Sequence, residues 1–257
     1  MTTAKTDTIW PPDVLTLSID IGGSGFKASV VSAQGVMTTD RVRVDTPYPC
    51  PPERLVETVT ELVQPLLEVH RVSVGFPGLV RHGHVIEGPS LSRREYGGER
   101  DRELAEAWHG FDLAHALAQE FQLPTKVVND ADMQGCAVAS GSGLEFVMTL
   151  GTGVGTALFN DGALLPHLEL SHGPFRDGLT FDIALGNAQR KEIGNERWAK
   201  RVRKAIAAFD DMLFFDRIYV GGGNAKHLTT VDIGPKGEIV PNTSGILGGV
   251  RVWDLDT

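Results

Sequence analysis

Residues 14–27 read VLTLSIDIGGSGFK, and residues 146–156 repeat the pattern as FVMTLGTGVGT. In both stretches a short apolar run leads into a glycine-rich turn, and a second run of strand-forming residues follows it, which predicts two strand–turn–strand hairpins. Glycine lets backbone N–H groups approach an anion closely. One such turn on its own is also typical of an ordinary hairpin. Two of them in similar halves of a chain indicate a phosphate held between two lobes.

The rest of the first half predicts strands and helices in the order of an α/β protein. Strands are expected over Val36–Val44, Val72–Phe76 and Lys126–Val128. The apolar spacing of Glu53–Val69 predicts a helix, which Pro65 should kink or end early. The segment 81–110 is charged and has little periodicity, so we expect an irregular insertion there. A helix is expected over Phe111–Phe121.

The second half repeats this order after its own hairpin, at whose far end Asp161-Gly162 is a turn signal. A long helix is expected over Ile193–Phe215, then a strand over Arg217–Val220 and a third glycine cluster, Gly221-Gly222-Gly223. We therefore expect two similar α/β lobes facing each other across a cleft. The expected division is a flexible leader over 1–13, an N-terminal lobe over 14–128 that residues 243–257 complete, and a C-terminal lobe over 129–242.

Composition narrows the class of protein. The 257 residues carry a net charge of −9, which argues against general nucleic-acid binding, and no apolar run is long enough to span a membrane. Residues 1–10 lack the apolar core of a signal peptide. Two cysteines, Cys50 and Cys136, are too few for a disulfide framework or a cysteine-rich zinc site. These features predict a cytoplasmic protein with reduced thiols and no structural zinc.

One segment is locally basic despite the acidic total. Seven cations fall within fifteen residues: Arg190, Lys191, Arg197, Lys200, Arg201, Arg203 and Lys204. Such a run is compatible with a solvated helix face. The alternative is a track for an anionic substrate such as polyphosphate, because clustered cations focus a local field.

Three sets of polar residues are candidates for chemistry. Asp20 stands where the first strand meets its glycine turn, a position suited to hold Mg²⁺ through water. Asn129-Asp130 follows a buried strand where a helix should begin, so it is either a helix cap or a general base with an orienting amide. Glu169 and His172 share one face of a helical turn and are either ligands of adjacent hydroxyls or ordinary surface groups.

Together these motifs resemble the ROK sugar kinases of the sugar-kinase/actin superfamily, most closely their polyphosphate glucokinase branch. The likeness covers roughly residues 15–250. It is carried by the following segments: Asp20–Lys27 and Gly151–Thr156 as phosphate motifs, Val220–Gly223 as the adenosine motif, Ser244–Gly249 as a connecting motif, Asn129-Asp130-Ala131, Glu169-x-x-His172, Gly75–Gly78, Trp108–Leu113 and Arg190–Gly194 leading into Arg197-Trp198.

The resemblance implies an actin-like ATPase fold of two ribonuclease H-like lobes and a transfer of phosphate from polyphosphate, ATP or both to the 6-hydroxyl of glucose or a related hexose. Asp130 would be the catalytic base, with the sugar held by Gly78, Asn129, Glu169 and His172. Mg²⁺, bound through water to Asp20, would be the cofactor, and the enzyme would be a homodimer. The donor phosphates or nucleotide would lie against Asp20, Gly22, Gly23, Ser24, Gly25, Lys27, Gly151, Thr152, Gly153, Gly221, Gly222 and Gly223.

The chain also departs from the family pattern. Ser171 replaces a motif glycine, and residues 88–98 form a longer, more charged sugar-side loop without the expected asparagine near Ser90. Asp182 falls near the position of a further acidic sugar ligand. Two alternatives to the glucokinase reading follow, a kinase for a modified sugar and a non-catalytic sugar-binding regulator. A DNA-binding repressor is disfavoured, because the first strand begins near Val14 and leaves no room for a helix-turn-helix.

Overall fold

The computed structural model, which describes residues 10–241 and 244–254, is built around two five-stranded sheets with the same strand order. The first sheet has the order β3-β2-β1-β4-β7 and the second has the order β10-β9-β8-β13-β14. In both, a central antiparallel hairpin continues into two parallel strands. The strands are β1 Leu15–Gly22, β2 Gly25–Ser32, β3 Val42–Val44, β4 Arg71–Phe76, β7 Thr125–Asn129, β8 Leu144–Leu150, β9 Val154–Asn160, β10 Ala163–Leu164, β13 Arg217–Gly221 and β14 Gly237–Ile239.

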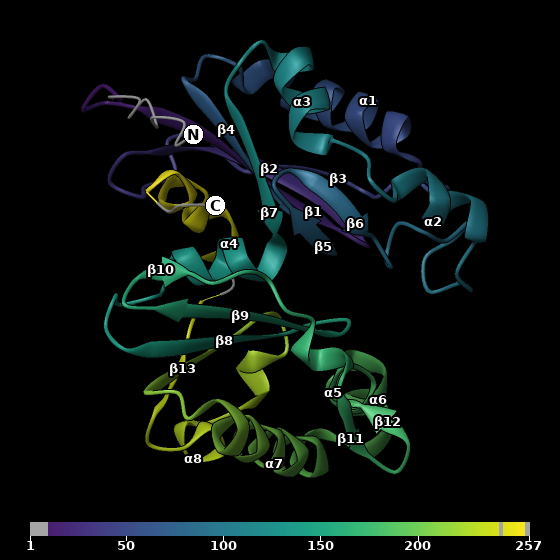
Figure 1. The fold of residues 1–257 in the computed structure, drawn as a ribbon, viewed down its shortest axis with the longest axis vertical. Coiled ribbons are helices and arrows are strands. Elements are labelled where there is room, and N and C mark those ends of the chain that lie inside the picture. Colours follow the sequence, from purple (N-terminus) through teal and green to yellow (C-terminus); the bar gives the residue numbers. More distant parts are fainter. Residues whose placement is uncertain (1–9, 242–243, 255–257) are drawn as a thin grey trace, which may run out of the picture.

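Helices cover the outer face of each sheet and also separate the two sheets (Figure 1). In the first lobe α1 (Pro52–Val63) and α3 (Leu113–Phe121) pack outside, and in the second lobe α7 (Asn195–Leu213) and α8 (Thr230–Ile233) do so. The short helix α4 (Asp130–Cys136) lies between the sheets. The predicted α/β fold of two similar lobes is confirmed.

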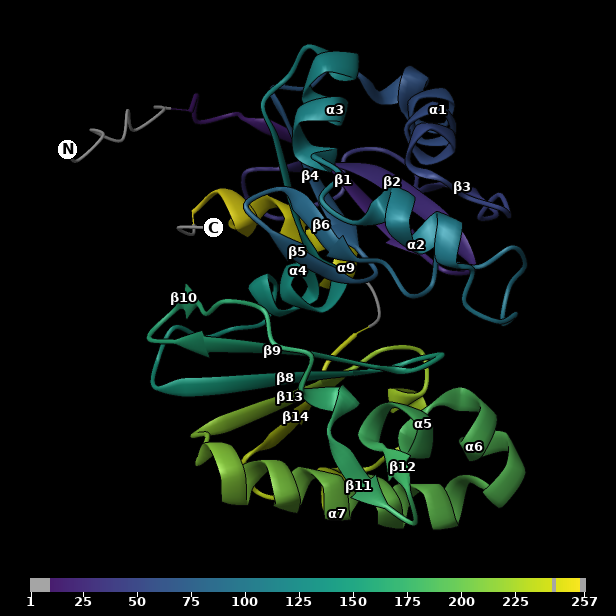
Figure 2. The same ribbon diagram turned by 45° about the vertical axis from the view of Figure 1, so that its right-hand side comes forward.

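The C-terminal segment returns to the first sheet. Helix α9 (Ser244–Leu247) and the 3₁₀ helix Gly248–Trp253 pack against α4 and the first sheet (Figure 2). Ser73 Oγ donates a hydrogen bond to the Gly249 carbonyl at 2.6 Å. A side chain at Gly248 would meet the Met133 carbonyl at 1.7 Å, so only glycine allows this close approach. At the other end of the described chain, Trp10 packs edge-on against Trp253, with ring centroids 5.3 Å apart.

Several element boundaries differ from the sequence-based expectations, and the residues explain why. The first helix ends at Val63 and a 3₁₀ turn carries the chain past Pro65, as the missing proline N–H requires. Only Val42–Val44 of the expected third strand pairs fully. The expected long helix is α7, which runs from Asn195 to Leu213; a separate helix that the sequence did not predict, α6 (Asn187–Ile193), precedes it, and Gly194 with a φ of +81° divides the two.

The segment 81–110 is more ordered than an irregular insertion. It continues β5 (Leu79–Arg81) into β6 (His84–Glu87) as a small hairpin and then forms α2 (Arg102–Trp108), which the Asp101 side chain caps. Short strands and a single two-turn helix leave too few residues for a clear periodicity. No helix of the described residues is long and apolar enough to cross a membrane.

Candidate active site

The first glycine turn closes the β1–β2 hairpin between Gly22 and Gly25. Two side chains from the following loop hold its backbone: Thr46 Oγ1 donates to the Gly22 carbonyl at 2.6 Å and Tyr48 Oη donates to the Gly23 carbonyl at 2.7 Å. Asp20 faces Lys27 across the hairpin, and Lys27 Nζ lies 3.0 Å from Asp20 Oδ2. The backbone of the turn is therefore held by two side chains of the following loop, and the Asp20–Lys27 ion pair lies at the base of the turn.

The second glycine turn is braced by Asp182, from helix α5 (Phe181–Leu185). Asp182 Oδ1 accepts the Val154 N–H at 2.7 Å, and a Cβ at Gly153 would lie 2.1 Å from the same oxygen. Only glycine fits there. Asp182 Oδ1 thus holds the backbone of the second glycine turn, while the sequence-based placement of Asp182 near a sugar stays a prediction.

The third glycine cluster lies directly against the second. Asn224 donates its backbone N–H to the Leu150 carbonyl and its side-chain Nδ2–H to the Gly151 carbonyl, both at 2.9 Å. Gly222 has a φ of +84°, and a Cβ there would meet the Leu150 carbonyl at 2.5 Å. The structure thus joins Gly151–Gly153 and Gly221–Gly223 into one backbone-lined corner of the second lobe.

Asn129 resolves the ambiguity about the start of α4. Its Oδ1 accepts the N–H groups of Ala131 at 2.7 Å and Asp132 at 3.4 Å, so Asn129 is the N-cap. Its Nδ2 donates to the Gly78 carbonyl at 2.9 Å, tying the end of β4 to this helix. Gly78 itself packs too closely for a side chain, since a Cβ would lie 2.1 Å from the Glu87 carbonyl. Asp130 is therefore not needed as the cap.

Asp130 lies between the two hairpins. Its neighbour Ala131 contacts the second hairpin, where a Cβ at Gly155 would lie 2.9 Å from Ala131 Cβ. Burial raises the pKa of Asp130, and the negative charge of Asp20 from the first hairpin raises it further, to about 7. A carboxylate whose pKa lies near neutrality is suited to accept a proton in one step and release it in the next.

A buried histidine, His167, joins the polar residues of α4 to the Glu169 segment. His167 Nδ1 lies 2.9 Å from Asp132 Oδ1, and its Nε2 lies 3.6 Å from Glu169 Oε1. Burial alone would lower the pKa of His167, but the hydrogen bond with Asp132 and the nearby carboxylate of Glu169 outweigh it and raise the pKa to about 9. His167 is thus an imidazolium between two carboxylates at neutral pH.

Glu169 is oriented by this pair and by His172, whose Nε2 lies 3.8 Å from Glu169 Oε2. Burial would raise the pKa of Glu169, but the nearby imidazolium of His167 and the charge of His172 lower it below its usual value. Sequence reasoning identified Glu169 and His172 but missed His167. The only signal was its place two residues before Glu169, and its partner Asp132 is 35 residues away.

The loop 88–98 reaches across to the second lobe. Tyr96 Oη lies 3.2 Å from Thr152 Oγ1 in the second glycine turn, and the Tyr96 ring packs edge-on against Tyr48 at 6.5 Å between centroids. Tyr48 holds the first glycine turn as well as the Ser90 carbonyl. The loop 88–98 therefore connects the first and the second glycine turn through Tyr48 and Tyr96.

The described residues contain no group of three or more His, Cys, Asp or Glu side chains able to hold a metal ion by themselves. Mg²⁺ commonly takes only one or two carboxylates and keeps several waters. Asp20 has its Oδ1 free of the Lys27 ion pair, and its charge acts on Asp130. The donor set therefore fits a water-bound Mg²⁺ at Asp20.

The fold belongs to a known class. Two lobes of equal strand order, each with a glycine hairpin, form the actin-like ATPase fold. The structure of the polyphosphate/ATP-glucomannokinase of Arthrobacter sp. strain KM is similar, with a TM-score of 0.78 and 27% sequence identity. The match covers 94% of this chain and 99% of that one. Within this class the chain belongs to the ROK family, whose sequence model matches residues 16–167.

Two relatives with similar sequences are named as sugar kinases. A polyphosphate glucokinase of Mycobacterium tuberculosis is 26% identical over 93% of this chain and 91% of its own length. An N-acetylmannosamine kinase of Escherichia fergusonii is 34% identical over 83% of this chain and 72% of its own length. The two relatives differ in the sugar that they are named for, so family membership leaves the acceptor open.

Proposed function

We propose that this protein is a kinase that transfers a phosphoryl group from polyphosphate, ATP or both to the 6-hydroxyl of glucose or a closely related hexose. The observation that carries the proposal is the position of Asp130 between the two glycine hairpins, with a pKa of about 7. A proton acceptor placed beside two backbone-lined phosphate sites suits phosphoryl transfer, which depends on positioning and electrostatics.

In the proposed step the sugar hydroxyl oxygen forms a bond to the terminal phosphorus of the donor, and the bond from that phosphorus to its bridging oxygen breaks. Asp130 accepts the hydroxyl proton. Glu169, held by His167, binds ring hydroxyls together with His172 and the remaining N–H of Asn129. Mg²⁺, when bound, neutralises charge on the donor phosphates, and Asp20 would hold it through water.

The donor phosphates would lie between the two glycine turns, with the nucleotide end of ATP toward Gly221–Gly223. Support comes from the open backbone at Gly151 and Gly223, where a Cβ would meet nothing within 4 Å. Lys27 stands beside Asp20 and would neutralise part of the phosphate charge. The contact between Tyr96 and Thr152 would close the site over the donor and keep water from competing with the sugar.

The test is a matrix of acceptors and donors. The purified protein is incubated with Mg²⁺, glucose, mannose or N-acetylmannosamine, and either ATP or long-chain polyphosphate, and sugar phosphates are measured by mass spectrometry. A hexose 6-phosphate is expected with at least one pair. Sugar binding by calorimetry without product from any pair would instead support the non-catalytic regulator.

The pH dependence of turnover reports the protonation of Asp130. Because a general base acts in its deprotonated form, kcat/KM is expected to rise with pH through the neutral range and to level off above it. The measurement is kcat/KM for the sugar between pH 5.5 and 8.5 at saturating donor, and on the acid limb it is expected to rise by up to about tenfold per pH unit. A flat profile across this range would contradict the assignment.

Replacing Glu169 by glutamine is expected to raise the KM for the sugar by roughly 10–100-fold, because a charge-assisted hydrogen bond to a hydroxyl is worth about 1.5–3 kcal/mol. The exposed Glu57, in the α1 surface pair with Arg54, offers the matched control Glu57→Gln. Steady-state kinetics with varied sugar measures both. An unchanged KM in Glu169→Gln would remove Glu169 from the sugar site.

A further inference from the structure

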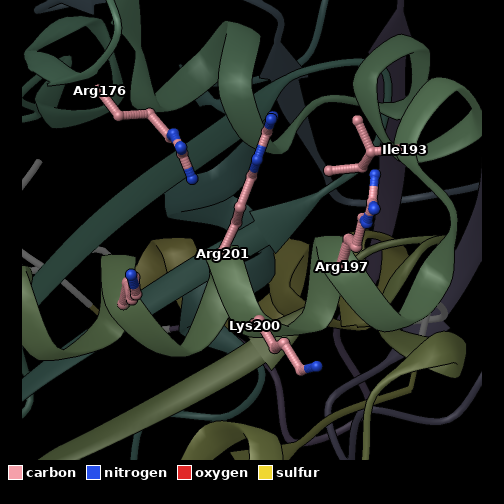
Figure 3. A pocket seen from close by; sticks show the side chains of 6 residues that line it. Arg176, Ile193, Arg197, Lys200 and Arg201 are labelled. Carbon is pink, nitrogen blue, oxygen red and sulfur yellow. The ribbon is translucent and has the colours of Figure 1, made fainter.

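A cavity of about 260 Å³ lies on the second lobe beside α7, apart from the residues assigned to catalysis. Figure 3 shows Arg197 and Arg201 rising from α7, with Arg176 pointing down toward Arg201 and Arg197 pointing toward Ile193. Arg176 is the last residue of the small strand β11 (Pro174–Arg176). The lining is almost wholly cationic: Arg176, Ile193, Arg197, Lys200, Arg201 and Lys204. The structure thus adds Arg176 to the basic run seen in the sequence and directs Arg203 elsewhere, to Asp232 at 2.9 Å.

Carboxylates neutralise only part of this charge. Arg176 pairs with Asp177 at 2.9 Å and Lys200 pairs with Glu196 at 2.8 Å. Arg201 is held by neutral acceptors, the Gln189 side chain at 2.7 Å and the Ala184 carbonyl at 3.3 Å. The other two cations, on the same helix face, form no hydrogen bond or ion pair within residues 10–241 and 244–254: Arg197 and Lys204.

The arrangement costs helix stability in the absence of a ligand. Arg197 and Arg201 stand four residues apart, as do Lys200 and Lys204, and like charges at this spacing repel on a helix surface. The buried face of α7 does not require them, since Trp198, Val202 and Phe209 make its core contacts. An anchored guanidinium flanked by unneutralised cations is instead suited to bind an anion.

Helix α6 connects this cavity to the second glycine turn. Its first residue, Asn187, donates its N–H to the carbonyls of Gly151 and Thr152, both at 3.1 Å. Its last residue, Ile193, lines the cavity. Seven helical residues span about 10 Å. The cation cluster therefore lies one short helix away from the proposed donor site.

Arg190 stands on the connecting helix and carries a further charge that no carboxylate neutralises among the described residues. Its two terminal nitrogens donate to the side chains of Asn195 at 2.7 Å and Asn187 at 3.0 Å, and no carboxylate pairs with it among the described residues. Its buried Nε has no hydrogen-bond partner there. Cationic groups thus continue from the glycine turn along α6 to the cavity.

We infer that the cavity formed by Arg176, Arg197, Lys200, Arg201 and Lys204 binds the distal phosphates of a polyphosphate chain whose terminal phosphate lies at the glycine turns. The inference rests on the proposed function and deepens it, because it assigns a second site to one donor. A linear polyanion long enough to follow α6 contacts both sites. ATP and tripolyphosphate are confined to the glycine turns, so the cavity does not contribute to their binding.

The test replaces the two unpaired cations, in the variant Arg197→Gln/Lys204→Gln. A matched control, Arg102→Gln/Arg217→Gln, removes the same charge from two exposed arginines on other elements. Two charge-assisted contacts are lost, so the KM for long-chain polyphosphate is expected to rise about tenfold or more, with that for ATP and tripolyphosphate within about twofold of wild type. The control is expected to match wild type with all three donors.

Binding is measured separately from turnover, by fluorescence anisotropy of end-labelled long-chain polyphosphate at two salt concentrations. The inference is supported if the cavity variant, but not the control variant, binds polyphosphate more weakly and with a smaller salt dependence. This holds even if no sugar is phosphorylated, and in that case only the proposed function fails. Unchanged polyphosphate binding, or equal KM changes with ATP, overturns it. The inference is also overturned if wild type binds labelled oligouridylate as tightly as polyphosphate and the cavity variant loses both to the same extent. That result would indicate a nucleic-acid site.

Discussion

Replacing Asp130 by asparagine is expected to lower kcat by about 10²–10⁴-fold, the usual contribution of a general base, while the sugar still binds. Asparagine keeps the shape of the side chain but has no site for the hydroxyl proton. The start of α4 should not suffer, because Asn129 caps it. The measurement pairs steady-state kcat with calorimetric binding of the sugar, so that loss of chemistry is separated from loss of binding.

The exposed Asp45, paired with Arg43 outside the site, supplies the matched control Asp45→Asn, which should retain wild-type kcat. A thermal unfolding curve checks that Asp130→Asn folds. Burial and the charge of Asp20 both disfavour an ionised Asp130, so its neutralisation should leave stability equal to or above that of wild type. A variant that keeps more than a tenth of wild-type kcat would mean that the base lies elsewhere.

The local features of this fold were predictable from sequence because their signals are local. Apolar runs that enter glycine turns predicted both hairpins, and their repetition predicted two lobes of one strand order. Pro65 predicted the early end of the first helix, since its lack of an N–H acts within one turn. Where the elements are very short, as in the hairpin and helix within 81–110, the pattern carried too few residues to be recognised.

The contacts between distant residues could not be predicted in the same way. Tyr96 contacts Thr152, which lies 56 residues later in the chain, and no periodicity of the sequence indicates this contact. Asp182 Oδ1 accepts the N–H of Val154, 28 positions earlier in the chain, and no local pattern indicates that contact. Arg176 lies outside the basic run yet completes its cavity, because β11 brings it over α7. In each case tertiary packing, not local sequence, determines the partner.

His167→Leu is expected to lower the free energy of unfolding by about 3–5 kcal/mol, because it leaves the buried Asp132 carboxylate without its cationic partner. The measurement is urea unfolding at pH 6. The double variant Asp132→Asn/His167→Gln replaces the ion pair by a neutral hydrogen-bonded pair and should recover much of this loss. A His167→Leu variant within about 1 kcal/mol of wild type would show that the pair is not stabilising.

The two variants also separate a structural role of His167 from a positioning role. If the imidazolium orients Glu169, the double variant should fold well and still show a raised sugar KM, because Glu169 has lost its charged partner. A sugar KM equal to that of wild type would leave His167 with a purely structural role.

The stability difference between wild type and His167→Leu should depend on pH in one direction. The folded pKa of His167, about 9, lies above its ordinary value of about 6.5, so its charge stabilises the fold fully below pH 6.5. That contribution is lost as the pH rises from 6.5 through about 9. The gap in unfolding free energy should therefore be largest near pH 6 and shrink toward pH 10. A gap that widens with pH would mean that His167 is buried in its neutral form, and Glu169 would then be oriented by His172 alone.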